Sequence, residues 1–398
     1  MRALLEAWRD AWQEQAQWHS DGAVLRFVRS RPDQPLPAPR GREVALESSE
    51  RGIQRVRLDA SFAIRVARGD PHRLEAPLHI AEGLQKIGYA GVAPLIGTAV
   101  IDDGTQTQVF ALAHEWPVNQ GHAQDWTLSF LRRSLHEYRA TGPERQRQLV
   151  QACRPLALRL GASLGDLHCA LAGLGTGQPL DTAWLRDVLS DSLRGFRAQA
   201  AALREHLALT PEEIRATARR LRSLDDSLSQ AEAGLAQPVH GHLSLTRVLL
   251  ATGEVCFVDF TEPPAVLAAP GTTLGCRLAD LAALLHAIDQ AGAIVAGESD
   301  GDDEIALDFV QAFRAQAREA LLAGYFERCP DRDSATEPRL RRHLLRLLQT
   351  WHAVRDLDPA QRPESLASSW LALRSALNLS MHGNRLNRFR RAAEAVAR

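Results

Sequence analysis

Hydrophobic and polar positions change their pattern after the first third of the chain. Up to residue 115, short apolar runs alternate with turn residues, which is typical of a sheet of short strands. Residues 1–30 begin with helical spacing and continue into an apolar stretch at 24–28. A helix is predicted over His72–Ile87, because Asp70 and Pro71 are typical helix-start residues. Strands are predicted over Glu43–Ser48, Gln54–Leu58, Ser61–Ala67, Val92–Gly97, Thr98–Ile101 and Gln108–His114.

From Asp125 onward, apolar residues recur every three or four positions between polar faces, which predicts amphipathic helices. The predicted helices are Thr127–Tyr138, Glu144–Ala172, Trp184–Leu207, Pro211–Glu232, Leu278–Ala291, Glu304–Phe326, Arg339–Val354 and Glu364–Asn378. One stretch interrupts them, Pro238–Pro263, where a tight loop precedes two short apolar strands around a turn at 252–254.

This order of elements predicts an α+β, bilobal, protein-kinase-like fold. Residues 1–115 would form an N-terminal cap and a small β-rich N-lobe, and Glu115-Trp116-Pro117 would be a hinge-like exit from it. Residues 116–398 would form a large helical C-lobe with an embedded catalytic-loop hairpin at 238–263.

The composition excludes several other classes of protein. A chain of 398 residues with 45% hydrophobic and 24% charged residues can build two lobes with ordinary cores. The net charge of −1 leaves no basic stripe for nucleic acid, and we expect no membrane partner because no apolar run looks long enough to span a bilayer. The five cysteines are scattered without a CxxC pair, which indicates reduced thiols in a cytoplasmic protein. Lys86 is the only lysine.

Motifs follow one another in a fixed order over residues 45–290. The segments are Ala63–Val66, Gly69–Glu75, Val92–Gly97, Ala113–Gly121 with Asp125 and Trp126, Leu164–Leu171, His240–Pro263 and Asp280–Asp289. Together they resemble the bacterial maltokinases, a branch of the aminoglycoside-phosphotransferase-like kinases often fused to or partnered with trehalose synthase. The resemblance implies an ATP-binding transferase that phosphorylates a maltose-like sugar.

The resemblance also assigns roles, and three of the residues present do not suit them. Arg65 stands where the family has its phosphate-binding lysine, His242 where it has the catalytic Asp, and Arg247 where it has a neutral metal ligand. Asp259 keeps the family's metal carboxylate, and Glu75 keeps the helix position expected to pair with Arg65.

Three further positions are assigned to nucleotide binding. Ser49 and Gly52 fall in the phosphate-covering loop, and Glu115 begins the hinge. His168 is expected to be a core histidine.

The leading hypothesis is a pseudokinase, because three polar roles are lost together while the apolar frame is kept. It would bind ATP with Mg²⁺ held weakly or not at all, and would have a binding or regulatory role in trehalose, maltose or α-glucan metabolism, with trehalose synthase or another α-glucan enzyme as partner.

A second hypothesis is an active sugar kinase that uses His242 as base and Asp259, with Glu262 or Asp280, for the metal. A third is a nucleotide-sensing module that needs no metal, with Arg247 in place of the cation. A metal site made by His240, His242 and Asp259 is a further alternative.

Overall fold

The computed structural model describes residues 2–20, 23–37, 45–50, 53–59, 61–67, 70–175, 177, 179–225, 234–251, 254–298, 303–329, 338–358, 366–377 and 379. The chain forms two compact units, Met1–Gly121 with Arg247–Glu262, and His122–Thr246 with Pro263–Arg398. The predicted division fell at residue 115 and left all of 238–263 in the helical part. The structure instead groups 247–262 with the N-terminal unit, because apolar residues of this segment pack against Ala63 and Trp116.

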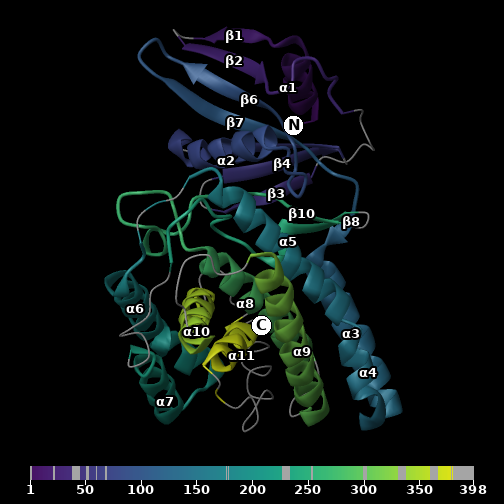
Figure 1. The fold of residues 1–398 in the computed structure, drawn as a ribbon, viewed down its shortest axis with the longest axis vertical. Helices are drawn as coiled ribbons and strands as arrows, with labels where there is room; N and C mark the ends of the chain where they lie inside the picture. The colour runs from purple at the N-terminus through teal and green to yellow at the C-terminus, as the bar shows by residue number, and fades with distance from the viewer. Residues whose placement is uncertain are drawn as a thin grey trace. The chain divides into compact units, whose positions relative to one another are not determined.

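The N-terminal unit is built on a seven-stranded antiparallel sheet in the order β1-β2-β6-β7-β5-β4-β3 (Figure 1). The strands are β1 (Gln17–Ser20), β2 (Ala23–Arg29), β3 (Ala45–Glu50), β4 (Ile53–Asp59), β5 (Phe62–Ala67), β6 (Leu95–Asp102) and β7 (Thr107–Glu115). Two helices belong to the same unit, α1 (Arg2–Glu14) and α2 (Glu75–Lys86), and the 3-10 turn η1 (Pro71–Leu74) leads into α2.

Alternating side chains along β7 give this sheet two apolar faces. Ala111 and Ala113 lie in one buried cluster with Trp12 of α1. Leu112, between them in sequence, lies in another cluster with Leu74, against which side chains of α2 pack. The two helices therefore cover opposite faces of the sheet.

A second, three-stranded sheet has the order β10-β9-β8, from β8 (Asn119–His122), β9 (Val248–Ala251) and β10 (Val255–Phe257). Both strands of the predicted hairpin are confirmed, and residues 252–253 of its turn lie outside the described residues. Leu249 and Cys256 of this hairpin are in one buried cluster with Ala63 and Trp116.

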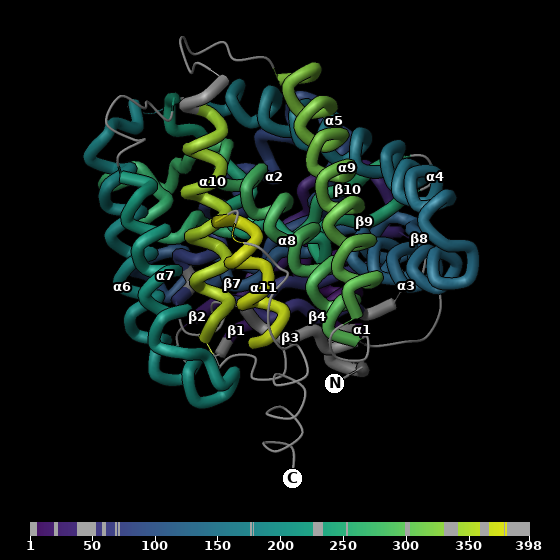
Figure 2. Tube along the Cα trace, turned by 90° about the horizontal axis from the view of Figure 1, so that it is seen from below, coloured from purple at the N-terminus to yellow at the C-terminus, as the bar shows by residue number. Residues whose placement is uncertain are grey.

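The second unit is helical. Its helices are α3 (Ala123–Thr141), α4 (Gln146–Gln151), α5 (Arg154–Ala172), α6 (Thr182–Leu207), α7 (Pro211–Arg222), α8 (Arg277–Gly297), α9 (Glu304–Arg328), α10 (Pro338–Arg355) and α11 (Leu366–Ala376). Local sequence fixes several starts: Asp181 caps α6 by accepting from Trp184 N, and Thr210 with Glu213 forms a capping box on α7. Helix α8 lies at the centre and contacts α3, α9, α10 and α11 (Figure 2).

Helix α8 corrects the expectation that no apolar segment is long enough to cross a membrane. It has 21 residues, and an 18-residue window within it reaches a mean hydropathy of 1.4, so it is long and apolar enough to cross a membrane by length and composition. However, 89% of the tested window is buried inside the structure, as in the core helix of a folded unit.

Other differences from the predicted elements are local. The apolar stretch at 24–28, which received no assignment, is strand β2, paired with β1. The two strands predicted over 92–101 are the single strand β6, and the helix predicted over Glu144–Ala172 is broken into α4 and α5. Helix α7 ends at Arg222, and the rest of its predicted range reaches 226–233, outside the described residues.

Candidate functional site

Strand register brings two arginines together in the N-terminal unit. In the antiparallel pairing of β4 with β5, Arg55 lies directly opposite Arg65. Like charges at opposite positions of a ladder repel each other, so this pair needs a compensating anion. Asp259 supplies it from the residues just after β10, where its backbone takes a left-handed conformation with φ of 63°.

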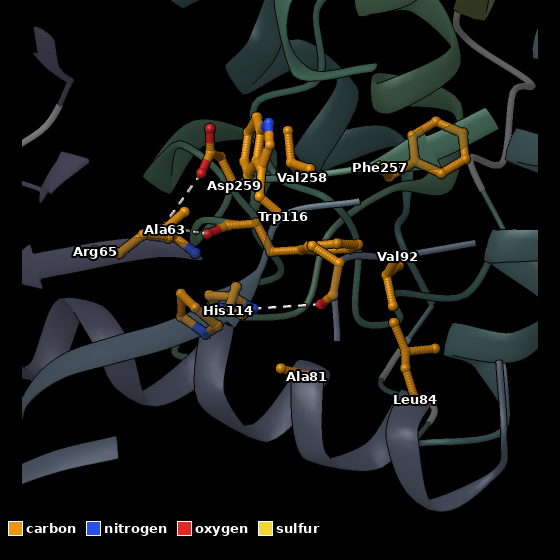
Figure 3. Close-up of a pocket in the computed structure, with 13 residues that line it drawn as sticks. Ala63, Arg65, Ala81, Leu84, Val92, His114, Trp116, Phe257, Val258 and Asp259 are labelled. Carbon is orange, nitrogen blue, oxygen red and sulfur yellow. Dashed lines mark hydrogen bonds and ion pairs between the residues drawn. The ribbon is translucent and has the colours of Figure 1, made fainter. Parts of the chain in front are cut away.

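Three guanidinium groups converge on Asp259. Its carboxylate accepts a hydrogen bond from Arg55. It also forms an ion pair with Arg65, whose Nε lies 3.7 Å from Oδ1 (Figure 3). Arg65 also donates from Nη2 to the carbonyl oxygen of Phe260 at 2.6 Å. Arg247 donates from Nη1 to the carbonyl oxygen of Asp259 at 3.1 Å. One carboxylate therefore balances three positive side chains.

The electrostatics of this cluster follow from burial and from these partners. Burial works to raise the pKa of Asp259, but Arg55, Arg65 and Arg247 outweigh it and hold that pKa below the ordinary 3.8. Burial lowers the pKa of Arg65 to about 10, and the neighbouring arginines add to the effect while Asp259 opposes it. The pKa of Arg55 is lowered in the same way. Burial is therefore the main cause of both lowered pKa values, and the neighbouring guanidinium groups add to it.

An apolar pocket enclosing about 440 Å³ of empty space, part of it open to solvent, adjoins this cluster within the same unit (Figure 3). Strand β5, helix α2 and the segment 257–260 supply its walls, with Ala63, Ala81, Leu84 and Val92 among the lining residues.

His114, near the end of β7, is a titratable residue in the wall of this pocket. Burial lowers its pKa to about 4, and the nearby Arg65 adds to this, so the ring is neutral at pH 7. Its Nδ1 lies 3.3 Å from the carbonyl oxygen of Ala93, which fixes Nδ1 as the protonated nitrogen. The neutral ring therefore adds no charge to the arginine cluster.

Trp116 is buried inside the unit, where it lines the pocket. Its side chain is 2% exposed, and the guanidinium groups of Arg55 and Arg57 lie 5.1 and 6.0 Å from its ring centroid. The backbone N–H groups of Glu115 and Trp116 donate to the carbonyl oxygens of Pro94 and Ser61 at 2.9 and 2.8 Å. The predicted hinge thus uses these backbone donors within the protein.

The predicted Arg65–Glu75 pair does not form. Arg65 is 4% exposed and turns its charge to Asp259, which also excludes a solvent-facing arginine. Glu75, with 58% of its side chain exposed, pairs with His72, whose Nδ1 lies 2.6 Å from Oε1. Arg65 pairs with Asp259 because both side chains are largely buried, whereas Glu75 is exposed.

In the second unit, Asp280 holds the loop that carries His242. Its carboxylate accepts the backbone N–H of His240 at 2.7 Å and that of Gly241 at 3.1 Å. His168, fully buried as expected, lies 3.2 Å from the same carboxylate through Nε2 and 2.9 Å from the Tyr325 hydroxyl through Nδ1. Asp280 is therefore a structural anchor for the loop.

The remaining predicted site residues are divided between the units. Arg65, Arg247 and Asp259 come together in the N-terminal unit, whereas His242 belongs to the second. Ser49 lies on β3, where side chains are not described, and Gly52 lies outside the described residues. Among the residues that the structure describes, no group of three or more His, Cys, Asp or Glu side chains is arranged to hold a metal ion.

Sequence reasoning missed Arg55. The connection between β4 and β5 does not reveal it, because the register shifts between Arg57 and Asp59 and only the shifted register places Arg55 across from Arg65. The structural role of Asp280 was also missed, because an aspartate that accepts backbone N–H groups has no sequence pattern that separates it from a metal ligand.

Comparison with solved structures identifies the class of fold. The chain is similar to a glucosamine kinase solved in complex with glucosamine, ADP and inorganic phosphate, with a TM-score of 0.63 and 20% identity over 94% of this chain and 82% of that one. Two crystal forms of glucosamine kinase give TM-scores of 0.64 and 0.60 at 21% identity, covering 93% and 94% of this chain and 80% and 98% of the other. The fold is thus α+β and of the bilobal, kinase-like class. No family model matches the sequence, and neither does any curated protein.

Proposed function

We propose that this protein is a maltokinase-like pseudokinase that binds a phosphate-bearing ligand without a metal ion. The observation that carries the proposal is the enclosure of Asp259, the one retained metal carboxylate of the resemblance, by the guanidinium groups of Arg55 and Arg65, with Arg247 on its carbonyl oxygen.

The residues around Asp259 do not fit Mg²⁺. This cation needs several oxygen ligands, and here the carboxylate oxygens are already held by arginines. Two unit charges of the same sign 4 Å apart repel by about 4 kcal/mol at an effective dielectric of 20, and a divalent ion would meet three guanidinium groups. The proposed function therefore includes no metal-dependent step at this site.

The same charges suit an anion. Three arginines lie around one carboxylate in a largely buried cluster, beside an apolar pocket. Guanidinium groups bind phosphate through charge-assisted, often bidentate hydrogen bonds. The ligand class that fits is a nucleotide or a sugar phosphate, and the resemblance to maltokinases favours ATP or ADP. The glucosamine kinase similar to this chain was solved with ADP.

An active sugar kinase is less well supported. It would need Glu262 or Asp280 to complete a metal site with Asp259, but Asp280 already accepts two backbone N–H groups. Burial, with Asp70 and Glu75 nearby, raises the pKa of Glu262, which disfavours its charged form. A cytoplasmic regulatory role beside trehalose synthase or another α-glucan enzyme follows from the resemblance alone and is part of the proposal.

Thermal unfolding with nucleotides, in EDTA and in Mg²⁺, tests the proposal. We expect ATP or ADP in EDTA to stabilise the protein, by about 2.7 kcal/mol at a hundredfold excess over Kd. Arg247→Gln is expected to remove most of that stabilisation. Arg26→Gln is the matched control, because Arg26 pairs with Asp102 at the surface of the same unit.

A phosphotransfer assay with maltose and glucosamine completes the test. No transfer above background is expected. Mg²⁺-dependent turnover that disappears in Asp259→Ala would overturn the pseudokinase assignment. If no nucleotide or sugar phosphate raises the unfolding temperature in EDTA, the proposal of metal-free ligand binding is overturned.

A further inference from the structure

Helices α5 and α9 approach each other backbone to backbone in the second unit. A Cβ placed on Gly161 would lie 2.0 Å from the carbonyl oxygen of Leu321, and one on Gly324 would lie 2.1 Å from that of Leu158. Neither position has room for a side chain, so these glycines allow the close contact. Figure 2 shows the two helices running side by side.

Two cysteines meet at one end of this contact. Cys169 lies one helical turn after Gly165, where a Cβ would be 3.3 Å from the backbone nitrogen of Cys329. Cys169 is exposed, and its Sγ donates to the carbonyl oxygen of Arg328 at 3.5 Å. Cys329 directly follows Arg328 at the end of α9 and is 3% exposed, so the Cys169 sulfur lies against the backbone next to it. The two thiols are 160 positions apart in sequence but adjacent in the fold.

The chemical surroundings of the pair differ from those of the other cysteines. Arg277 donates from Nη1 to the Sγ of Cys329 at 2.9 Å, so a cation faces the sulfur and favours its thiolate form. Burial still raises the pKa of Cys329 to about 11, which leaves the exposed Cys169 as the sulfur that an outside reagent can reach. The remaining three cysteines, Cys153, Cys256 and Cys276, are buried.

We propose that Cys169 and Cys329 form a dithiol modification site that reacts with small disulfides such as oxidised glutathione. The Cys169 thiolate attacks one sulfur of the reagent, a mixed disulfide forms, and one glutathione thiolate leaves. Cys329 then loses its proton and attacks the Sγ of Cys169, and the second glutathione thiolate leaves. The protein pair is oxidised by two electrons, the reagent is reduced to two thiols, and the two protons go to the released glutathione.

A chain of contacts links this site to the loop at 240–242. Asp280 is ionised, so His168, which burial keeps neutral, donates a hydrogen bond to it from Nε2 and accepts one from the Tyr325 hydroxyl at Nδ1. Tyr325 is linked to Cys329 through the backbone, because the N–H of Cys329 donates to the carbonyl oxygen of Tyr325 at 2.9 Å. A disulfide at Cys329 would displace this end of α9, and we expect the support of the loop by Asp280 to weaken.

The test is oxidation of the native full-length protein by oxidised glutathione, followed by acid quenching, alkylation and peptide mapping. We expect a Cys169–Cys329 linked peptide and no retained glutathione. Cys169→Ser should stay unmodified, and Cys329→Ser should hold glutathione on Cys169. Cys153→Ala, which removes a cysteine outside the pair, should behave like the wild type. Glutathione that persists on Cys169 of the wild-type protein would overturn the proposal.

Two further measurements probe the pair in the reduced protein and its coupling to the loop. Phenylarsine oxide bridges two neighbouring thiols with loss of water, so it should bind the wild-type protein one to one and be lost in Cys169→Ser. In the oxidised protein, hydrogen exchange at the amides of His240 and Gly241 should be faster than in the reduced protein. A linked peptide with unchanged exchange at both amides would overturn the coupling to the loop.

Discussion

At Asp259 a left-handed backbone and a largely buried carboxylate occur in the same residue. The φ of 63° is unusual for a residue other than glycine, although aspartate and asparagine tolerate it better than most. Only 15% of the side chain is exposed, and its charge offsets the repulsion between Arg55 and Arg65 across the β4–β5 ladder. The residue therefore has a structural role that does not depend on any metal.

Asp259→Asn isolates that role, because asparagine keeps the shape and tolerates the same backbone conformation. The substitution removes the negative charge that Arg55 and Arg65 share. We expect a loss of about 2 kcal/mol in the free energy of unfolding, measured by urea denaturation. Sulfate should restore part of the loss in the variant and less in the wild type. A variant as stable as the wild type in the absence of anions would contradict this role.

The sequence identified Arg65, Arg247 and Asp259 as members of one site through their positions in a motif pattern. It assigned the wrong partner to Arg65, since the motif named Glu75 and the structure supplies Asp259. Motif positions specify which residues are close to a site. They do not specify which of several nearby charges a long, flexible side chain selects.

At the scale of elements, helices were predicted more accurately than strands. Helix α6 was expected from Trp184 to Leu207 and runs from Thr182 to Leu207, because its apolar stripe repeats over many turns. Strands β1 and β2 were missed. They have four and seven residues, too few to establish a period, and Trp18 and Val28 are apolar yet exposed.

The α5–α9 contact gives a prediction at this scale. Gly324→Ala would place a methyl group 2.1 Å from the carbonyl oxygen of Leu158, which is backbone and cannot rotate away. We expect a loss of about 3 kcal/mol in the free energy of unfolding, because the helices must separate.

Gly297→Ala is the matched control for that substitution. Gly297 ends helix α8, is exposed, and has nothing within 4 Å of an added Cβ. Its replacement should leave stability unchanged or raise it by about 0.5 kcal/mol. Equal effects of the two substitutions in urea denaturation would mean that the close helix contact is not present in solution.

For the whole molecule, the sequence predicted the order of a β-rich part and a helical part but not which unit includes residues 247–262. That segment follows a helical region and precedes another, so sequence order alone assigns it to the helical part. Its apolar side chains pack with Ala63 and Trp116 instead, more than 130 positions earlier in the chain. Long-range packing of this kind leaves no local pattern.

Buried neutral histidines in both units predict how stability depends on pH. Burial lowers the pKa of His114 to about 4 and that of His352 to about 3, and it lowers the pKa of His168 as well, each from an ordinary 6.5. Below pH 6.5 the unfolded chain binds protons at these positions and the folded protein does not. Stability therefore falls with decreasing pH, by up to about 1.4 kcal/mol per pH unit for each histidine.

Buried carboxylates change stability at a lower pH than the histidines, so the two contributions can be measured separately. Asp259 and Asp280 have pKa values below 3.8, so the stability they contribute is lost only as the pH falls below that value. Urea denaturation between pH 7 and pH 4.5 should therefore report the histidines. His352→Gln, which can still donate to the carbonyl oxygen of Ala279, should reduce the slope of stability against pH in this window. A slope identical to that of the wild type would show that His352 is not buried in its neutral form.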